Sequence, residues 1–259
     1  MAGSIYDVAL AYLAMAGDEP QTPELRGMPP ANLKDFEKTS DLSGLKVGVY
    51  RKYFQDADSE IVQSCDMALD LLSAAGAEIV EITIANLDAI RLSHLCTIAS
   101  EFAQSMDKYF CHNSRWFAPE TQVSLHMAGQ MTSRDYISAQ KVRAYTAQQM
   151  REIFQEVDVI ALPSTGDFTP EIAPGSEETG EVNISILGRI MRFATLANFV
   201  GLPAISIPVG KAKCSVPIGL QLIGDHYDEA KLLRMANALS NHSLSAPYKP
   251  AAYYGEDLL

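Results

Sequence analysis

The chain has 259 residues, of which 47% are hydrophobic and 20% charged, and these values exclude a largely disordered protein. Its formal net charge of −12, without a dense basic segment, argues against nucleic acid as a partner. No apolar run approaches the roughly 20 residues that a membrane-spanning helix needs, so no transmembrane segment is expected.

The sequence contains four cysteines without the spacing of a metal or redox motif, namely Cys65, Cys96, Cys111 and Cys214. The residues after Met1 do not form a basic region followed by an apolar one, as a secretory leader would. Structural thiols in a reducing compartment are therefore expected. The predicted location is the cytoplasm, at most peripheral to an internal membrane.

The first third of the chain shows a strand–helix–strand pattern. In order, the expected elements are a helix over 5–16, an irregular surface crossing over 18–44, a strand over 45–50, a helix over 59–75 and a strand over 77–82. Two strands joined by one helix predict a parallel pair with a right-handed crossover.

The remainder of the chain alternates longer helices with three more strands. Its expected elements are helices over 87–110 and 133–156 with a shorter helix between them, a buried strand over 157–162, a loop over 163–183, a helix over 185–200, strands over 204–209 and 216–223, a helix over 226–240 and an irregular tail that includes Pro247, Pro250, Tyr253 and Tyr254. Ser133, Arg134 and Asp135 are expected to cap the helix over 133–156. The alternation predicts an α/β fold with a mixed, twisted β-sheet flanked by helices.

The common catalytic and cofactor motifs are missing from this sequence. It has no GxSxG elbow, no GxGxxG or GxxxxGK[ST] loop and no HExxH pair. We therefore expect neither a metal nor a cofactor. Asp56, Asp58 and Glu60 form a carboxylate cluster, whose expected role is to cap the helix that begins at Ser59, with a metal site as the weaker alternative.

One segment offers hydroxyls and backbone amides at the end of a buried strand, Pro163-Ser164-Thr165-Gly166. Ligands in open α/β sheets bind at the carboxyl ends of strands, so the segment could face a ligand. It could equally be a turn that satisfies its own backbone. Phe168, Phe193 and Phe199 could line an apolar pocket, or simply pack in the core.

Three segments together resemble the amidase signature family. Residues 201–210 read G-L-P-A-I-S-I-P-V-G and match its G-L-P-A-I-S-x-P-x-G run. Residues 216–224 match its L-P-I-G-L-Q-L-I-G strand with Val in the first position, and residues 158–165 match its D-V-x-x-x-P-T strand and loop. This resemblance spans nearly the whole chain.

Within that family, the chain is most similar to the plant-type fatty acid amide hydrolase branch. The similarity rests on D-Y-I-S-A-Q at residues 135–140, P-S-T-G at 163–166 and M-R-F at 191–193. The resemblance implies hydrolysis of N-acylethanolamines to a fatty acid and ethanolamine, hence a role in lipid metabolism. It also implies a homodimer associated with internal membranes.

The resemblance does not extend to the family's catalytic groups. The family uses a Ser-cisSer-Lys triad whose nucleophile lies on a Gly/Ser-rich loop, and all of these groups lie upstream of the helix that the first residues here resemble. No G-G-S-S-G-G run occurs in the chain, so no catalytic residue is carried over. We interpret residues 1–259 as the C-terminal portion of an amidase domain, without its N-terminal catalytic portion. We expect this portion to be inactive alone. In such a fragment an apolar face should be exposed where the sheet continues.

The resemblance does imply residues that line the wall of an acyl channel. These residues are candidates for substrate binding, and packing in the core is the competing explanation for them. The candidates are Ser164, Thr165, Gly166, Phe168, Met191, Phe193 and Phe199. Two alternative functions remain: a non-catalytic module that binds an acyl ligand or regulates a partner, and a fragment similar to the A-subunit of an amidotransferase.

Overall fold

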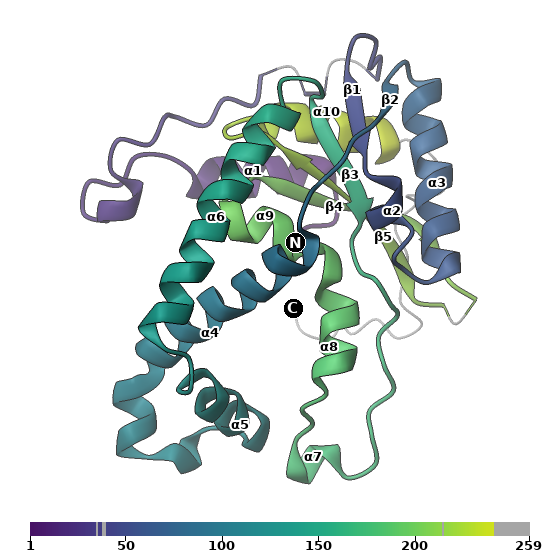
Figure 1. Cartoon of the computed structure of the whole chain (residues 1–259). Helices are drawn as coiled ribbons and strands as arrows, with labels where there is room; N and C mark the ends of the chain where they lie inside the picture. Colours follow the sequence, from purple (N-terminus) through teal and green to yellow (C-terminus); the bar gives the residue numbers. More distant parts are fainter. Residues whose placement is uncertain (35, 38–39, 214, 241–259) are drawn as a thin grey trace, which may run out of the picture.

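The computed structural model describes residues 1–34, 36–37, 40–213 and 215–240. It shows one twisted sheet with helices on both faces, and two groups of helices that project away from the sheet (Figure 1). The irregular tail expected around Pro247, Pro250, Tyr253 and Tyr254 lies outside the described residues, as does Cys214.

Five strands form the sheet in the order β2-β1-β3-β5-β4. They are β1 (Lys46–Val49), β2 (Glu78–Glu81), β3 (Val159–Pro163), β4 (Ala204–Lys211) and β5 (Pro217–Gly224). Strand β1 runs parallel to β2 and β3, whereas β5 runs antiparallel to β3 and β4. The mixed α/β fold expected from the sequence is confirmed. Strand β4 lies at one edge of this sheet, and no described strand pairs with its outer side.

The helices of the described chain alternate with these strands. The α-helices are α1 (Ile5–Met15), α2 (Arg51–Phe54), α3 (Ser59–Ala74), α4 (Leu87–His112), α5 (Pro119–Ala128), α6 (Ser133–Ile153), α7 (Ser176–Thr179), α8 (Ile184–Ile190), α9 (Thr195–Val200) and α10 (Glu229–Ser240), and the 3-10 turns are η1 (Pro23–Leu25), η2 (Ser114–Trp116) and η3 (Met191–Phe193). Among the described residues, no helix is both long and apolar enough to cross a membrane.

The single helix expected over 185–200 is wrong, because the chain turns between α8 and α9. Two side chains from other elements hydrogen bond to the carbonyls of this turn. Tyr53 Oη donates to the Arg192 carbonyl at 2.6 Å, and Gln221 Nε2 donates to the Phe193 carbonyl at 3.1 Å. These hydrogen bonds give the two carbonyls partners that a continuous α-helix would otherwise supply. The turn also places the fully buried Phe193 ring in the core.

Helix α6 begins at Ser133 as expected, but its N-cap lies one residue before the expected cap. Thr132 is the N-cap residue, and its hydroxyl accepts a hydrogen bond from the Asp135 amide at 3.2 Å. The Asp135 carboxylate in turn accepts from the Thr132 amide at 2.9 Å. The two residues form a capping box, so of the three expected cap residues only Asp135 takes part, and Ser133 and Arg134 do not.

This capping box predicts a pH dependence of stability. The hydrogen bonds from Thr132 hold the pKa of Asp135 below its ordinary value of 3.8. Because the folded-state pKa is the lower one, this contribution is present above the unfolded-state pKa and lost as the pH falls through the folded-state pKa. We expect Asp135→Ala to lower the Tm at neutral pH, and the Tm difference from the wild type to shrink in acid. A Tm difference that stays constant with pH would contradict this.

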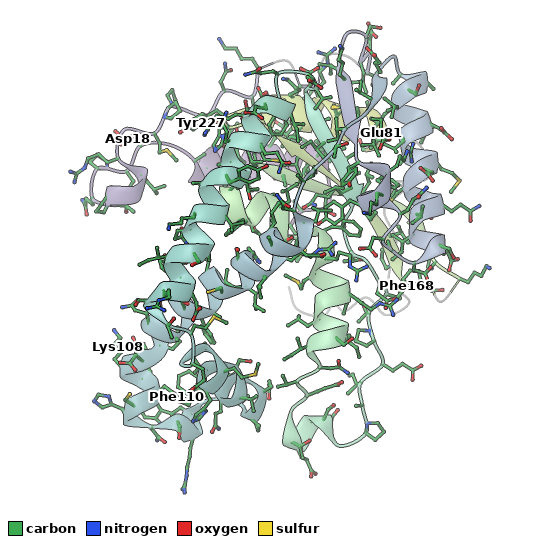
Figure 2. All side chains as sticks on the ribbon, viewed as in Figure 1. Asp18, Glu81, Lys108, Phe110, Phe168 and Tyr227 are labelled. Atoms are coloured by element: carbon green, nitrogen blue, oxygen red, sulfur yellow. The ribbon has the colours of Figure 1, made fainter. Side chains whose placement is uncertain are left out.

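Helices α4 and α5 form a lobe that projects from the sheet together with the first part of α6 (Figure 1). Phe110, labelled in Figure 2 near the end of the lobe beside Lys108, holds the lobe together. Its ring lies edge-to-face against Phe117, with centroids 5.6 Å apart, and against His126, with centroids 5.0 Å apart. Helices α7 and α8 run alongside this lobe, so the space between the two is bounded by helices on either side.

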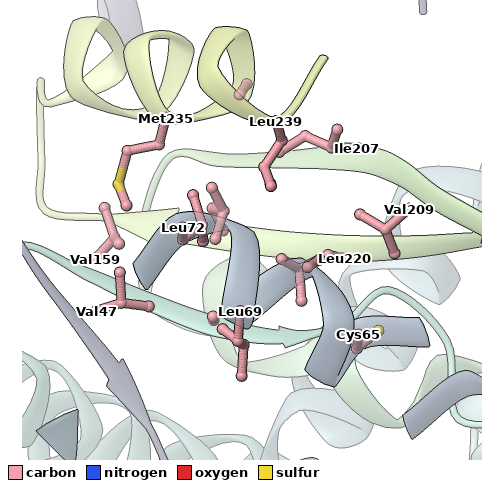
Figure 3. Packing of buried hydrophobic residues seen from close by; sticks show 14 of the residues in the cluster. Val47, Cys65, Leu69, Leu72, Val159, Ile207, Val209, Leu220, Met235 and Leu239 are labelled. Carbon is pink, nitrogen blue, oxygen red and sulfur yellow. The ribbon is translucent and has the colours of Figure 1, made fainter. Parts of the chain in front are cut away.

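The core lies in two layers, one on each face of the sheet. Figure 3 shows the first layer, in which Leu69 and Leu72 of α3 and Met235 and Leu239 of α10 pack on the strands. Cys65 is buried in this layer, and burial raises the pKa of its thiol to about 12. The second layer packs α6 and α9 on the opposite face. Burial of these apolar surfaces is the main force that holds the helices on the sheet.

Candidate functional site

The loop after β3 is anchored to the neighbouring strands. The Ser164 hydroxyl shares a short hydrogen bond with the Ser206 hydroxyl of β4, and the Ser164 amide donates to the Gly219 carbonyl at 2.8 Å. A Cβ atom at Gly219 would lie 2.6 Å from Ser164 Oγ, so glycine is needed on β5 for this approach. Thr165 is exposed beside the pair. The first candidate residues therefore lie on the sheet surface at β4 and β5.

Gly166 brings two chain segments together. Its carbonyl accepts a hydrogen bond from the Asp58 amide at 3.0 Å, at the start of α3. A Cβ atom at this position would collide with the backbone carbonyl of Arg189 in α8. Asp167 adds an ion pair to the Arg189 guanidinium at 2.9 Å. This part of the loop fixes α8 against the body of the protein.

Replacement of Gly166 by Ala should therefore lower the free energy of unfolding by about 1–3 kcal/mol, the usual cost of overpacking. Denaturant unfolding measures this directly. Gly188→Ala is the matched control, because nothing lies within 4 Å of a Cβ at Gly188 and alanine is the better helix former. Equal stabilities of the two variants would show that α8 can move away from Gly166 without cost.

The aromatic candidates mostly belong to the core. Phe193 is fully buried, with its ring centroid 4.8 Å from that of Tyr53. Phe199 is also buried, in edge-to-face contact with His94, whose pKa is lowered by burial. Phe168 is half-buried and packs at the edge of the first core layer (Figure 2). Phe193 and Phe199 thus pack in the core, and their role as substrate-binding residues stays a prediction.

Met191 lies between α8 and α9 and is 40% exposed. None of the seven candidates lines either of the two hollows described next.

A polar cleft of about 710 Å³ opens at the carboxyl ends of β1 and β2, beside the first turn of α4. Three of its four charged side chains, Asp56, Asp88 and Arg91, are paired within the protein, and the fourth is Lys52. The Arg91 guanidinium lies 3.3 Å from Asp56 and 3.4 Å from Asp88, and stacks over the Tyr53 ring at 5.2 Å. Burial raises the pKa of that Tyr53 hydroxyl, which keeps it a neutral donor. The Asp56, Asp88 and Arg91 charges of the cleft are thus already engaged within the protein.

The carboxylate cluster predicted at the start of α3 separates into three different contacts. Asp58 caps α3, accepting from the Glu60 amide at 2.8 Å, so the capping role is confirmed for this residue. Asp56 pairs with Arg91 and Arg192 instead. The Glu60 carboxylate accepts from the backbone of Lys213 at 2.9 Å. In the described part of the chain, no group of His, Cys, Asp and Glu side chains is placed to hold a metal ion.

An apolar groove of about 320 Å³ lies between the lobe and α8. It is lined by Leu95, Ile98, Ala99 and Phe102 of α4, by Ser124, Met127, Ala128 and Met131 of α5 and the turn after it, and by Val182, Ile184 and Leu187 of the chain that enters and forms α8. Ser124 has the only side-chain hydroxyl, and this hydroxyl donates to the Glu120 carbonyl at 2.8 Å. The groove therefore offers apolar surface without a free polar group.

A glycine lets the chain that leads into α8 approach the start of α5 closely. Gly180 adopts φ +72, in the left-handed region that favours glycine, and a Cβ atom there would collide with the Glu120 carboxylate. Val182 and Ile184 follow Gly180 and line the groove together with residues of α5. Ile184 is 54% exposed and Leu187 is 56% exposed, so the groove is open to solvent and accessible to a ligand.

The sequence contained one signal for this groove. Leu95, Ile98 and Phe102 recur with helical spacing on α4, beside the buried face formed by Ile90 and His94. A second apolar stripe on one helix indicates a second contact surface. The opposite wall comes from residues about 90 positions later in the sequence, which spacing within one helix cannot reveal.

Comparison with known proteins agrees with the resemblance seen in the sequence. The family model described as Amidase matches residues 1–233. A fatty acid amide hydrolase from Oryza sativa subsp. indica is 37% identical over 98% of this chain, and the A-subunit of a glutamyl-tRNA(Gln) amidotransferase from Koribacter versatilis is 29% identical over 95% of it. A solved bacterial aryl acylamidase of the amidase signature family superposes on 95% of the chain with TM-score 0.76, at 17% identity.

The chain is shorter than each of these proteins. It covers 43% of the rice enzyme, 55% of the amidotransferase polypeptide and 52% of the aryl acylamidase chain. The likeness nevertheless extends along almost all of the 259 residues. The family match, the plant relatives and the mixed sheet together show that this chain belongs to the amidase family.

Proposed function

We propose that this chain forms the acyl-binding part of a hydrolase that cleaves amide C–N bonds in fatty acyl amides such as N-acylethanolamines. The observation that carries the proposal is the apolar groove between α4, α5 and α8, with its nearly uninterrupted lining of hydrocarbon side chains. The plant relatives, named as fatty acid amide hydrolases, support the same substrate class.

The groove suits an alkyl chain by elementary energetics. Each methylene group removed from water contributes about 0.8 kcal/mol. Leu95, Ile98 and Leu187 are each about half exposed in the free protein, so an alkyl chain would cover apolar surface on both partners. A polar substrate such as a glutamyl group would find no hydrogen-bond partner there. This difference favours a fatty amide over the amidotransferase alternative.

We further propose that the catalytic groups lie on the part of the amidase fold that the 259 residues do not include. The chain covers less than half of the rice enzyme, and the Gly/Ser-rich loop of the family is absent from its sequence. The hydrogen bond between Ser164 and Ser206 joins two hydroxyls and includes no basic group. A serine without an adjacent base is a poor nucleophile. Alone, the chain should therefore bind the amide without cleaving it.

The remaining properties implied by the plant branch stay predictions for this chain. These are a role in lipid metabolism, a cytoplasmic location peripheral to internal membranes, and a homodimer. Cell fractionation and light scattering on the full protein test them. A purely regulatory module that only binds acyl ligands would have the same groove. Unlike part of a hydrolase, it would not hydrolyse amides even together with the remainder of an amidase fold.

Calorimetric titration with a series of N-acylethanolamines of increasing acyl length tests the groove. We expect the affinity to rise by about threefold to fourfold for each added methylene until the groove is filled, as 0.8 kcal/mol per group requires. Free glutamine serves as the polar control and should not bind. An affinity that does not depend on acyl length, or tighter binding of glutamine, would contradict the proposed substrate class.

A further inference from the structure

A hollow of about 410 Å³ opens where the end of α1 meets the start of α10, and the segment over 18–32 forms its third side. Figure 2 shows Tyr227, just before α10, on the same side of the molecule as Asp18 of this segment. The hollow is large enough for a small molecule. It shares no lining residue with the apolar groove, so it is a separate feature. The lining side chains that could interact with a ligand are Tyr12, Met15, Leu25, Met28, Tyr227 and Glu229.

The segment over 18–32 is held in place by its own contacts. The Asp18 carboxylate accepts a hydrogen bond from the Gly27 amide at 2.7 Å, and the Leu25 carbonyl accepts from the Met28 amide at 3.2 Å. The Tyr227 hydroxyl donates to the Met28 sulfur at 3.6 Å. This outer wall is therefore tied both to itself and to the residues that precede α10.

Tyr227 has a backbone conformation that packing in the core does not explain. Its φ of +65 lies in the left-handed region, which residues with a side chain rarely adopt. The side chain is 59% exposed, so burial of the ring does not offset this strain. Residues held in such conformations are concentrated at sites that contact ligands. The position of the Tyr227 ring at the edge of the hollow fits this pattern.

Glu229 is the only charged residue among the described residues that line the hollow. No described Lys, Arg or His side chain forms an ion pair with it, and Lys231 is engaged by Asp158 at 3.0 Å and by Asp228 at 2.8 Å. Burial and the hydrogen bond that its hydroxyl donates to Glu229 raise the pKa of Tyr12 to about 12, so Tyr12 stays neutral. The hollow thus presents one negative charge beside two tyrosine rings.

This combination of groups selects the chemistry of a ligand. The Glu229 carboxylate would repel an anion, and a neutral apolar ligand would cover this carboxylate without giving it a partner. A hydrated metal ion such as Ca²⁺ needs six to eight oxygen ligands, and the hollow has one carboxylate. A methylated ammonium group carries a diffuse positive charge, which both a carboxylate and aromatic rings attract. Its methyl groups would cover the thioether side chains of Met15 and Met28.

We propose that the hollow between α1, the segment over 18–32 and the start of α10 binds an organic cation with a methylated ammonium group. Glu229 balances the charge of the cation, and Tyr12 and Tyr227 contact its methyl groups. The net charge of −12 also favours the approach of a cation. A free cation and the choline headgroup of a lipid share this chemistry. Binding requires neither the apolar groove nor an acyl ligand, so the proposal goes beyond the proposed function.

Calorimetric titration of the full chain with choline chloride tests the proposal. The alcohol 3,3-dimethylbutan-1-ol is the matched ligand control, because it has the shape of choline with carbon in place of the charged nitrogen. We expect choline to bind at least about tenfold more tightly than the alcohol, since only the cation is attracted by the carboxylate and the rings. Sodium chloride keeps the ionic strength equal in all titrations.

Two variants locate the binding in the hollow. Glu229→Gln removes the charge at nearly constant size, and Tyr227→Leu removes the ring but keeps an apolar side chain. Each should weaken choline binding at least about fivefold. Tyr145→Leu is the control, because Tyr145 is a 53% exposed tyrosine on α6 that does not line the hollow, and it should bind choline like the wild type. Circular dichroism and Tm verify that the variants fold, and their affinity for an N-acylethanolamine should be unchanged.

Flotation with phosphatidylcholine vesicles distinguishes the two sources of the cation. Recruitment that both excess choline and Tyr227→Leu abolish would support a lipid headgroup as the ligand, and choline binding without recruitment would support a free cation. Absence of choline binding would overturn the proposal. Equal affinity for choline and the neutral alcohol would overturn it as well, as would unchanged choline affinity in Glu229→Gln and Tyr227→Leu.

Discussion

Ile98→Asp should weaken the binding of a long-chain N-acylethanolamine by about a hundredfold or more. Ile98 lies on α4 within the apolar groove, beside Leu95 and Phe102. A bound alkyl chain would have to strip water from the new carboxylate without offering it a hydrogen bond, which costs several kcal/mol. The side chain is 46% exposed in the free protein, so the fold itself should tolerate the change. Calorimetric titration of wild type and variant with the same ligand measures the effect.

The control for this substitution is Ile137→Asp, which introduces the same charge on an exposed helix position outside the groove. Its affinity for the ligand should equal that of the wild type. Leu187→Asp should reproduce the loss from the opposite wall, since Leu187 belongs to α8. If both groove variants bound the ligand as tightly as the wild type, the acyl chain would have to bind elsewhere.

Phe193→Ala should lower the free energy of unfolding by about 3–5 kcal/mol, as measured by denaturant unfolding. The Phe193 ring is fully buried, packs at 4.8 Å from Tyr53 and lies in the core layer shared by α6 and α9. Its removal would leave a cavity that the surrounding strands and helices cannot close. Because whole domains are stable by only about 5–15 kcal/mol, this is a large fraction of the total.

Met191→Ala is the control for this prediction, since Met191 lies two residues away and is 40% exposed. It should change stability by much less. The comparison also decides the role of Phe193 as a substrate-binding candidate. A variant that kept its stability but lost affinity for the acyl ligand would show that Phe193 contacts substrate and does not serve mainly in packing.

Much of the fold could be predicted from the sequence, because the responsible signals are local. The apolar runs before Tyr50 and Pro163 correspond to β1 and β3, and the alternating segment after Val216 corresponds to β5. The turn between α8 and α9 could not be predicted in this way. It depends on Tyr53 and Gln221, which lie far away in the sequence and hydrogen bond to its carbonyls.

The candidate site was predicted less completely than the fold. Motif matching selected Ser164 and Gly166 at the end of β3, and the structure shows that both make structural contacts with neighbouring segments. The groove consists of ordinary apolar residues without a motif. Phe102 and Leu187 face a common space because α4 and α8, which are distant in the sequence, pack on either side of it. A site formed by tertiary packing of such residues leaves little trace in a single sequence.

We expect this chain to bind the acyl group of a fatty amide but not to cleave the amide bond alone. The most direct test is to measure ethanolamine released from an N-acylethanolamine by the purified chain, at a ligand concentration that saturates binding. We predict binding without release above the rate in buffer. Release that increases with chain concentration would contradict the claim, because it would require a catalytic nucleophile within these 259 residues.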